Sequence, residues 1–458
     1  MLPHDRAGDV TMPTDAARAW VTTPDQEHLL ARQPDVPFRD APAPVTITVD
    51  EHRRFQRIEG FGASFTESSA TLVHDLLAPA ARNEVMRRLF DPQSGIGLSF
   101  LRQPMGATDF ALGNYTYDDV PDGASDPSLA RFSVERDDRA VVPLLREARH
   151  WNPRLSIMAS PWSAPAWMKS SRSLIGGTLD RDAYGPYARY FVRFVQEYAA
   201  RGIPIAAVTV QNEPHFSPTG YPGMTLSPAQ EAEFVGRYLG PAFAAAGIAT
   251  GVIAFDGNWD NASHAIAVLD DPVARPFLAG AAFHCYAGEP TRQQEVHDRH
   301  PDKTIYVTEC SGGGWSPDFA TNLRWGVHTL LVEAVTRWAA AVVTWNMALD
   351  QDAGPKNGGC QDCRGVVTVD TTTGVVAYNV EYYVLGHASK FVLPGATQVA
   401  TTTSASDGVE SVAFENPDGG RVLIVLNTAD GARRFRVRSS RGAFGSTLPA
   451  GAVATFTW

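Results

Sequence analysis

The sequence predicts an α/β fold: a parallel (β/α)8 barrel, also called a TIM barrel, with an associated antiparallel β-sandwich. Short apolar segments alternate with amphipathic helical segments through the middle of the chain, whereas residues 397–458 show only short alternating strands and turns. Of the 458 residues, 44% are hydrophobic and 19% are charged. This composition is typical of a chain with a large core, and the length indicates a barrel with an accessory domain.

Eight segments have the length and apolar content of buried strands. They are residues 58–65, 96–103, 155–160, 205–211, 250–255, 281–286, 303–309 and 341–346. Helical segments lie between them, for example at 83–90, 139–151, 181–201 and 228–243, and Ser227 before Pro228 is a good helix start. Strands joined by helices pair in parallel through right-handed crossovers, and eight such units favour a closed barrel over an open sheet.

The two ends of the chain are expected to build the sandwich together. Residues 397–458 contain alternating apolar runs separated by turn signals at 416–420 and 430–431, without a helical pattern. Residues 45–49 also alternate and precede the first barrel strand, so they are expected to add a strand. We therefore predict a sandwich contribution from 1–55, the catalytic barrel at 56–385 and the rest of the sandwich at 386–458.

Charge and hydropathy exclude several classes of partner. The net charge of −11 makes general nucleic-acid binding a poor hypothesis, because phosphate neutralisation needs a basic surface. No run of 18 apolar residues occurs, so no membrane insertion is expected. The first 30 residues are polar and lack a signal-peptide pattern. The sequence therefore leaves two localisations open, secretion after removal of a signal or the cytoplasm.

Two glutamates follow predicted strands at positions where barrel enzymes carry their chemistry. The fourth strand ends in Asn212-Glu213-Pro214 and the seventh in Thr308-Glu309, and the carboxyl ends of barrel strands meet at one mouth. Paired carboxyl groups suit cleavage of a glycosidic bond, in which one protonates the leaving oxygen and the other attacks or activates water. A single glutamate at a strand end is often only a solvated loop residue, but two on facing strands favour a catalytic pair. Pro214 is expected to restrict the backbone of Glu213.

Ordered segments along the chain resemble glycoside hydrolase family 30, which includes glucosylceramidases and β-1,6-glucanases. The matching segments are residues 20–23 (WVTT), 60–69 (GFGASFTESS), 101–110 (LRQPMGATDF), 160–169 (SPWSAPAWMK), 208–214 (VTVQNEP), 284–286 (HCY), 308–309 (TE) and 344–349 (TWNMAL). The resemblance implies a retaining enzyme with Glu213 as general acid/base and Glu309 as nucleophile. It also implies that Asn212 binds the sugar 2-hydroxyl and that Arg102 pairs with the nucleophile, where a cation would lower the pKa of Glu309.

The resemblance also places side chains around the sugar. Asp109, Trp162 and Trp345 match positions that line the subsite of the non-reducing sugar, with Asp109 on ring hydroxyls and a Trp face against the ring. Core packing is the alternative for each Trp. Tyr286 could orient the nucleophile, whereas His284 is more simply a hydrogen-bonded structural residue.

No cofactor or metal is expected. Cys360 and Cys363 form a single CxxC, whereas a zinc ribbon needs a second pair, so a local disulfide or two thiols near the cleft rim is predicted. Cys285 and Cys310 are predicted to be buried thiols. HExxH and GxSxG motifs do not occur, which argues against zincins and Ser hydrolases.

Loops after the seventh and eighth strands bear on the substrate. Residues 310–315 are rich in Gly, and both this segment and 352–365 depart from the lipid-hydrolysing members of the family. We therefore expect β-1,6-glucan or β-gluco-oligosaccharides as the carbohydrate substrate. A glucosylceramidase-like enzyme, an exo-acting β-glucosidase or β-xylosidase, and a non-catalytic carbohydrate-binding barrel are the alternatives, and a metal-dependent barrel enzyme lacks a ligand cluster.

Overall fold

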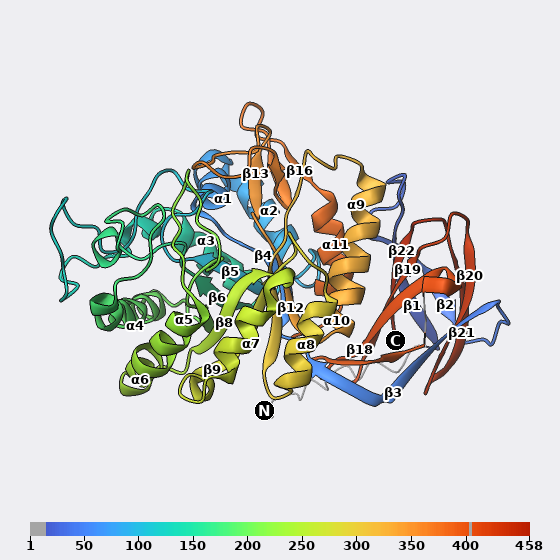
Figure 1. Cartoon of the computed structure of the whole chain (residues 1–458). Coiled ribbons are helices and arrows are strands. Elements are labelled where there is room, and N and C mark those ends of the chain that lie inside the picture. Colours follow the sequence, from blue (N-terminus) through green and yellow to red (C-terminus); the bar gives the residue numbers. More distant parts are fainter. Residues whose placement is uncertain (1–14, 403–404) are drawn as a thin grey trace, which may run out of the picture.

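The computed structural model describes residues 15–402 and 405–458 and confirms the predicted fold class. Eight parallel strands run in the order β4-β12-β10-β9-β8-β7-β6-β5 (Figure 1). Their bounds are β4 Gly60–Ala63, β5 Phe100–Pro104, β6 Ser156–Ser160, β7 Ala207–Thr209, β8 Gly251–Asn258, β9 Leu278–His284, β10 Thr304–Glu309 and β12 Ala339–Thr344. A parallel bridge between Ser64 and Arg102 links the first strand to the second and closes the barrel.

Helices cover the outside of the barrel. They are α1 Glu67–Thr71, α2 Pro79–Phe90, α3 Val141–Trp151, α4 Tyr184–Ala200, α5 Pro228–Phe234, α6 Gly240–Ala245, α7 Ala262–Asp270, α8 Thr291–Arg299, α9 Phe319–Gly326, α10 Ala334–Thr336 and α11 Val380–Ser389. The predicted start at Ser227 is confirmed, because its hydroxyl accepts from the N–H of Gln230 while the Gln230 side chain returns to the Ser227 N–H.

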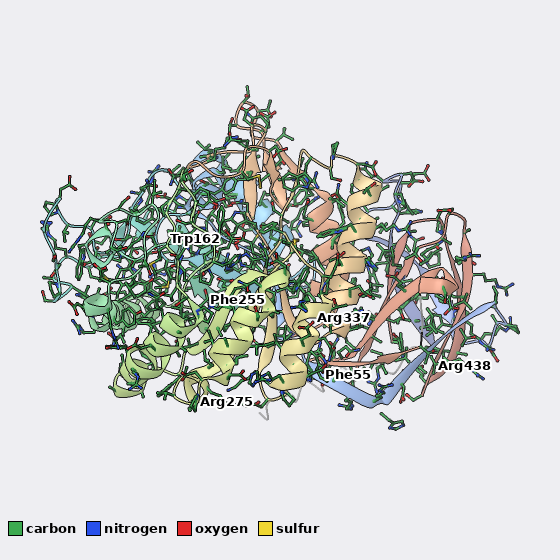
Figure 2. All side chains as sticks on the ribbon, viewed as in Figure 1. Phe55, Trp162, Phe255, Arg275, Arg337 and Arg438 are labelled. Carbon is green, nitrogen blue, oxygen red and sulfur yellow. A yellow bond between two sulfur atoms is a disulfide. The ribbon has the colours of Figure 1, made fainter. Side chains whose placement is uncertain are left out.

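Apolar side chains from the strands fill the barrel interior. The inward cluster consists of Phe100, Met158, Ala207, Ile253, Ala282, Tyr306, Ala341 and Val343, all buried. Figure 2 shows Trp162 and Phe255 within this half of the molecule and Arg438 on the other half. A filled barrel leaves its mouth, where the following loops converge, as the place for a site.

A second sheet combines strands from both ends of the chain, in the order β2-β1-β22-β19-β18-β17-β3-β20-β21 (Figure 1). The strands are β1 Ala16–Thr22, β2 Ala31–Pro37, β3 Val45–Arg57, β17 Thr397–Thr401, β18 Val409–Glu415, β19 Arg421–Asn427, β20 Arg433–Ser439, β21 Gly442–Leu448 and β22 Val453–Thr457. It encloses its own apolar core, and we call it the sandwich. It is not wholly antiparallel, because β3 pairs in parallel with β20.

A buried histidine connects the barrel to the sandwich. His387, on α11, hydrogen-bonds through its two ring nitrogens to the hydroxyls of Thr22 and Thr455, each at 2.8 Å. Burial lowers the pKa of His387 to about 3. The neutral imidazole of His387 therefore joins the barrel to the sandwich by hydrogen bonds.

Small sheets organise the loops at the mouth. β13 Ala348–Asp350, β15 Val367–Val369 and β16 Val376–Tyr378 form a three-stranded sheet, part of which projects above the barrel in Figure 1. β11 Gly312–Gly313 pairs with β14 Cys363–Arg364, which ties the loop after β10 to the loop after β12.

In the described ranges, no helix is both long and apolar enough to cross a membrane. Residues 1–14, which form part of the polar start considered for a signal peptide, lie outside the described residues.

Candidate active site

A cavity of about 370 Å³ opens at the mouth of the barrel. Five of the sequence-predicted residues line it: Asp109, Glu213, Tyr286, Glu309 and Trp345. They come from the ends of β9 and β10 and from the segments after β5, β7 and β12. The fold thus brings both predicted carboxyl groups to one cavity, together with a third acid and two aromatic side chains.

Glu309 is the last residue of β10 and is only 6% exposed. Its Oε2 accepts from Arg102 Nη1 at 2.6 Å, and its Oε1 accepts from the Tyr286 hydroxyl at 2.8 Å. Burial raises the pKa of Glu309, and this effect exceeds the opposing ones from the cations His284 and Arg102. Arg102 does lower the pKa of Glu309, as expected. The expectation of a lowered pKa overall was wrong, because burial outweighs this contribution.

Arg102 is fully buried and connects several strands. Its Nη2 donates to Asn212 Oδ1 and to Asp256 Oδ2, both at 2.7 Å. The guanidinium carbon also lies 4.7 Å from the centre of the Trp162 ring. A planar donor held at this many points fixes the nucleophile candidate and the amide in one geometry.

Asp256 is a central residue of the site that the sequence reasoning missed. Its carboxylate accepts hydrogen bonds of 2.6–2.9 Å from five side chains on five other strands, namely Arg102, Ser160, Thr209, His284 and Thr308. Although burial opposes ionisation, the charge of Arg102 and these hydrogen bonds hold its pKa far below its usual range. Its position directly after the predicted strand 250–255 was the signal that could have found it.

Glu213 lies just beyond β7 in an uncommon backbone conformation. Its φ of +46° falls in the left-handed region, rather than in the extended region usual before a proline. Its N–H donates to the Asp256 carbonyl and its own carbonyl accepts from the Phe216 N–H, both at 2.8 Å. These bonds, rather than Pro214 alone, direct the Glu213 side chain to the cavity, where it is 16% exposed.

His284 lies between the acids. Its Nε2 is 2.9 Å from Asp256 Oδ1, and its Nδ1 is 3.6 Å from Glu213 Oε1, an ion-pair distance rather than a hydrogen bond. Burial alone would lower the pKa of His284, but the charge of Glu309 and the interactions with Asp256 and Glu213 raise it to about 9. His284 is therefore a cation at neutral pH, which goes beyond the structural role first expected of it.

Asp109 and Trp345 line the cavity, whereas Trp162 does not line it and packs in a buried apolar cluster with Trp345. Trp162 and Trp345 stack with ring centres 5.0 Å apart and planes at 21°. Burial, reinforced by the charges of Glu309 and Glu213, raises the pKa of Asp109 well above that of an ordinary aspartate. Asp109 Oδ1 is buried and has no hydrogen-bond partner in the described part of the chain.

The prediction of two buried thiols at Cys285 and Cys310 was wrong, because these residues form a disulfide. They follow the neighbouring parallel strands β9 and β10, which brings their Cα atoms to 5.2 Å, within the range that a disulfide spans. Cys360 and Cys363 are also disulfide-bonded, which was one of the two alternatives, and both line the cavity. The described residues contain no cluster of three or more His, Cys, Asp or Glu that could hold a metal ion.

Comparison with known proteins agrees with this architecture. The profile of the glycosyl hydrolase family 30 TIM-barrel domain matches residues 58–392, and that of the family 30 β-sandwich domain matches residues 395–456. The chain belongs to glycosyl hydrolase family 30. It is therefore a glycoside hydrolase, and retention of the anomeric configuration is a general property of this family.

Family 30 relatives of two kinds resemble the chain. It is 34% identical over 410 residues to endo-1,6-β-D-glucanase neg1 of Aspergillus fumigatus, covering 83% of this chain and 81% of that protein. It is 30% identical to mouse lysosomal acid glucosylceramidase, covering 90% and 83%. The solved structure of the endo-β1,6-glucanase BT3312 superposes with a TM-score of 0.89 at 30% identity, covering 97% of this chain and 99% of that one.

Proposed function

We propose that this family 30 enzyme hydrolyses β-1,6-linked glucan by double displacement, with Glu309 as nucleophile and Glu213 as general acid/base. The observation that carries the proposal is the single cavity lined by both carboxyl groups, in which Glu309 is hydrogen-bonded and Glu213 is partly exposed. Similarity to endo-1,6-β-glucanases over most of the chain supports the linkage.

In the first step the Glu309 carboxylate attacks the anomeric carbon while Glu213 gives its proton to the leaving oxygen. The glycosidic bond breaks and an ester forms between the sugar and Glu309. The His284 cation, 3.6 Å from Glu213, stabilises the carboxylate that Glu213 becomes. Arg102 and Tyr286 hold the attacking carboxylate in place through bonds of 2.6 and 2.8 Å.

In the second step Glu213 takes a proton from water, and the oxygen of that water attacks the anomeric carbon. The ester breaks, Glu309 leaves as a carboxylate, and the sugar retains its β configuration. Asn212 is held by Arg102 through its Oδ1, so its amide N–H groups are free to meet the 2-hydroxyl of the sugar at the reaction centre.

The remaining predicted residues bind the sugar whose bond is cleaved. Trp345, which lines the cavity and stacks on the buried Trp162, offers an aromatic surface to the C–H groups of a β-glucosyl ring. Asp109, whose raised pKa favours the protonated form, can donate a hydrogen bond to one hydroxyl and accept from another. A β-glucoside, with its equatorial hydroxyls, satisfies this combination of a flat face and a polar edge.

Azide rescue of two variants tests the proposal. We expect Glu309→Ala to abolish hydrolysis of an aryl β-glucoside and azide to restore turnover as the α-glucosyl azide. Glu213→Ala, assayed with azide on a substrate with an activated leaving group, should yield the β-glucosyl azide. Without azide, its turnover should be about 10²–10⁴-fold lower than that of the unmodified enzyme. Glu289→Ala, a change of an exposed acid after β9, serves as the control.

The α-azide identifies the nucleophile and the β-azide identifies the general acid/base, so the two variants assign the two roles separately. A Glu309→Ala variant that keeps most of its activity would disprove the nucleophile assignment. NMR of the first product anomer tests retention in the unmodified enzyme. Hydrolysis of glucosylceramide with no cleavage of β-1,6-glucan would favour the glucosylceramidase-like alternative.

A further inference from the structure

A second cavity, of about 480 Å³, adjoins the catalytic one. It lies between α9, α11 and the loop after β10, and Tyr286 and Trp315 line both cavities. Its volume is in the range of about 300–1,000 Å³ typical of ligand sites. The proposed function gives it no role.

Exposed aromatic side chains mark the path between the two cavities. Among the described residues, the large aromatic side chains that are markedly exposed are Phe216 at 47%, Tyr286 at 44%, Trp315 at 57% and Trp325 at 42%. All four line one or both cavities. Because exposed aromatic surface gathered at one place marks a binding surface, this distribution indicates a continuous ligand track.

The second cavity lies across the barrel mouth from Asp109. Asp109 and Trp162 follow β5 and β6, whereas Tyr286 and Trp315 follow β9 and β10. The strand order of the closed barrel places β9 and β10 three or four positions away from β5 and β6. A chain whose cleaved sugar is bound by Asp109 therefore extends toward the second cavity.

The loop that carries Trp315 is fixed before any ligand arrives. A Cβ atom at Gly313 would lie 2.1 Å from the Trp315 ring, so the missing side chain lets the ring rest on the backbone. The Gly314 N–H donates to the Asp362 carbonyl at 2.7 Å, and β11 pairs with β14. The ring is thus preorganised, which lowers the entropy cost of binding.

Polar groups in the second cavity favour a hydroxylated ligand over an alkyl chain. Ser311, Asn322 and Glu381 line it together with the two tryptophans. Arg364 holds the Glu381 carboxylate at 2.8 Å. An alkyl chain would remove these groups from water without replacing their hydrogen bonds, whereas sugar hydroxyls replace them and the C–H faces of the rings pack on Trp315 and Trp325.

We propose that the second cavity binds glucosyl units of the leaving group, with Trp315 as the nearer platform and Trp325 as the remote one. This inference rests on the proposed β-1,6-glucan hydrolysis and adds to it a binding site that requires several sugar units on the leaving side. The enzyme therefore cleaves within chains and prefers long leaving groups.

Three variants test the site: Trp325→Ala, Trp315→Ala and Gly313→Ala, the last of which keeps the tryptophan but displaces its ring. The substrates are β-glucosyl fluoride, whose leaving group is one atom, reducing-end-labelled β-1,6-gluco-oligosaccharides of increasing length, and octyl β-glucoside, whose leaving group is an alkyl chain. Val375→Ala, at a side chain that is 64% exposed and outside both cavities, is the control.

We expect kcat/KM of the unmodified enzyme to rise with the length of the leaving group. Trp325→Ala should lower kcat/KM on the long oligosaccharides about tenfold, equivalent to about 1.4 kcal/mol. It should change kcat/KM on glucosyl fluoride by less than about twofold. Gly313→Ala should resemble Trp315→Ala. An unchanged dependence of kcat/KM on leaving-group length in both Trp variants would overturn the inference. So would a loss of kcat/KM on glucosyl fluoride as large as that on the oligosaccharides, or a loss seen only with octyl β-glucoside. An unmodified enzyme that fails on the fluoride and on all oligosaccharides would instead overturn the proposed function.

Discussion

Replacing Asp256 with Asn is expected to damage both stability and activity, although the side chain keeps its size. The carboxylate accepts five hydrogen bonds and neutralises Arg102 and the His284 cation. Asn loses the charge and two of the accepting positions, so Arg102 loses its main counter-charge and His284 loses the carboxylate to which it is hydrogen-bonded. Asn has nearly the same shape as Asp, so the positive φ of this position, +110°, strains both residues alike and does not cause any difference between them.

The magnitude follows from the burial of the pair. Removing one partner of a buried ion pair costs about 3–5 kcal/mol, and we expect that loss in the free energy of unfolding of the barrel. The guanidinium that aligns Glu309 also loses one charged hydrogen bond worth about 1.5–3 kcal/mol. If about 2–3 kcal/mol of that reaches the transition state, kcat/KM falls about 30–150-fold. The pKa of His284 should fall from about 9, because the cation keeps Glu309 and Glu213 but loses the carboxylate of Asp256.

Two assays check these values. Urea denaturation measures stability, and hydrolysis of an aryl β-glucoside across pH measures activity. Asp260→Asn, four residues along the chain and exposed, is the matched control. An Asp256→Asn enzyme that unfolds with the unmodified protein and keeps more than half of its activity would refute the role assigned to Asp256.

Two further changes test the covalent and pH-dependent supports of the fold. Replacing both Cys285 and Cys310 by Ser opens a link between residues 25 apart and should lower the free energy of unfolding by about 3–4 kcal/mol. The same change at Cys360 and Cys363, three residues apart, should cost only about 1–2 kcal/mol, and equal urea midpoints for the two variants would contradict this ordering. His387 is neutral when folded, with a pKa of about 3, whereas the unfolded state titrates near 6.5, so its stabilisation is lost as pH falls from about 6.5 toward 3. The loss is about 1.4 kcal/mol per pH unit in that window, and His387→Gln should show a shallower fall in urea midpoint between pH 7 and 4.5 than the unmodified protein.

Local pattern was sufficient to predict the barrel strands. β10, with its sequence TIYVTE, is a run of β-branched and aromatic residues that ends in Glu309, and the structure places it where the sequence did. The strands β1 and β2 were not predicted, because β1 finds its partner in β22, more than 400 residues away, and β2 (ARQPDVP) is polar and contains two prolines. Pairing of that kind depends on the tertiary fold rather than on local periodicity.

The candidate site was predictable only where its residues stand at strand ends. Strand-end reasoning found Glu213 and Glu309, and the resemblance added Arg102. Asp256 also follows a predicted strand, but it escaped because its five partners come together only when the barrel closes. The disulfide between Cys285 and Cys310 escaped for the same reason, since it depends on which strands become neighbours.

The sandwich draws its strands from both ends of the chain, and this has a consequence for biosynthesis. β3 ends at Arg57, and its antiparallel partner begins at Thr397, so the whole barrel is translated between them. At about 5–20 residues per second, the early strands wait on the order of 20–70 s before a complementary edge leaves the ribosome. Open strand edges invite pairing with other chains. The nascent chain is therefore most vulnerable to aggregation after its barrel has formed and before its last sixty residues have emerged.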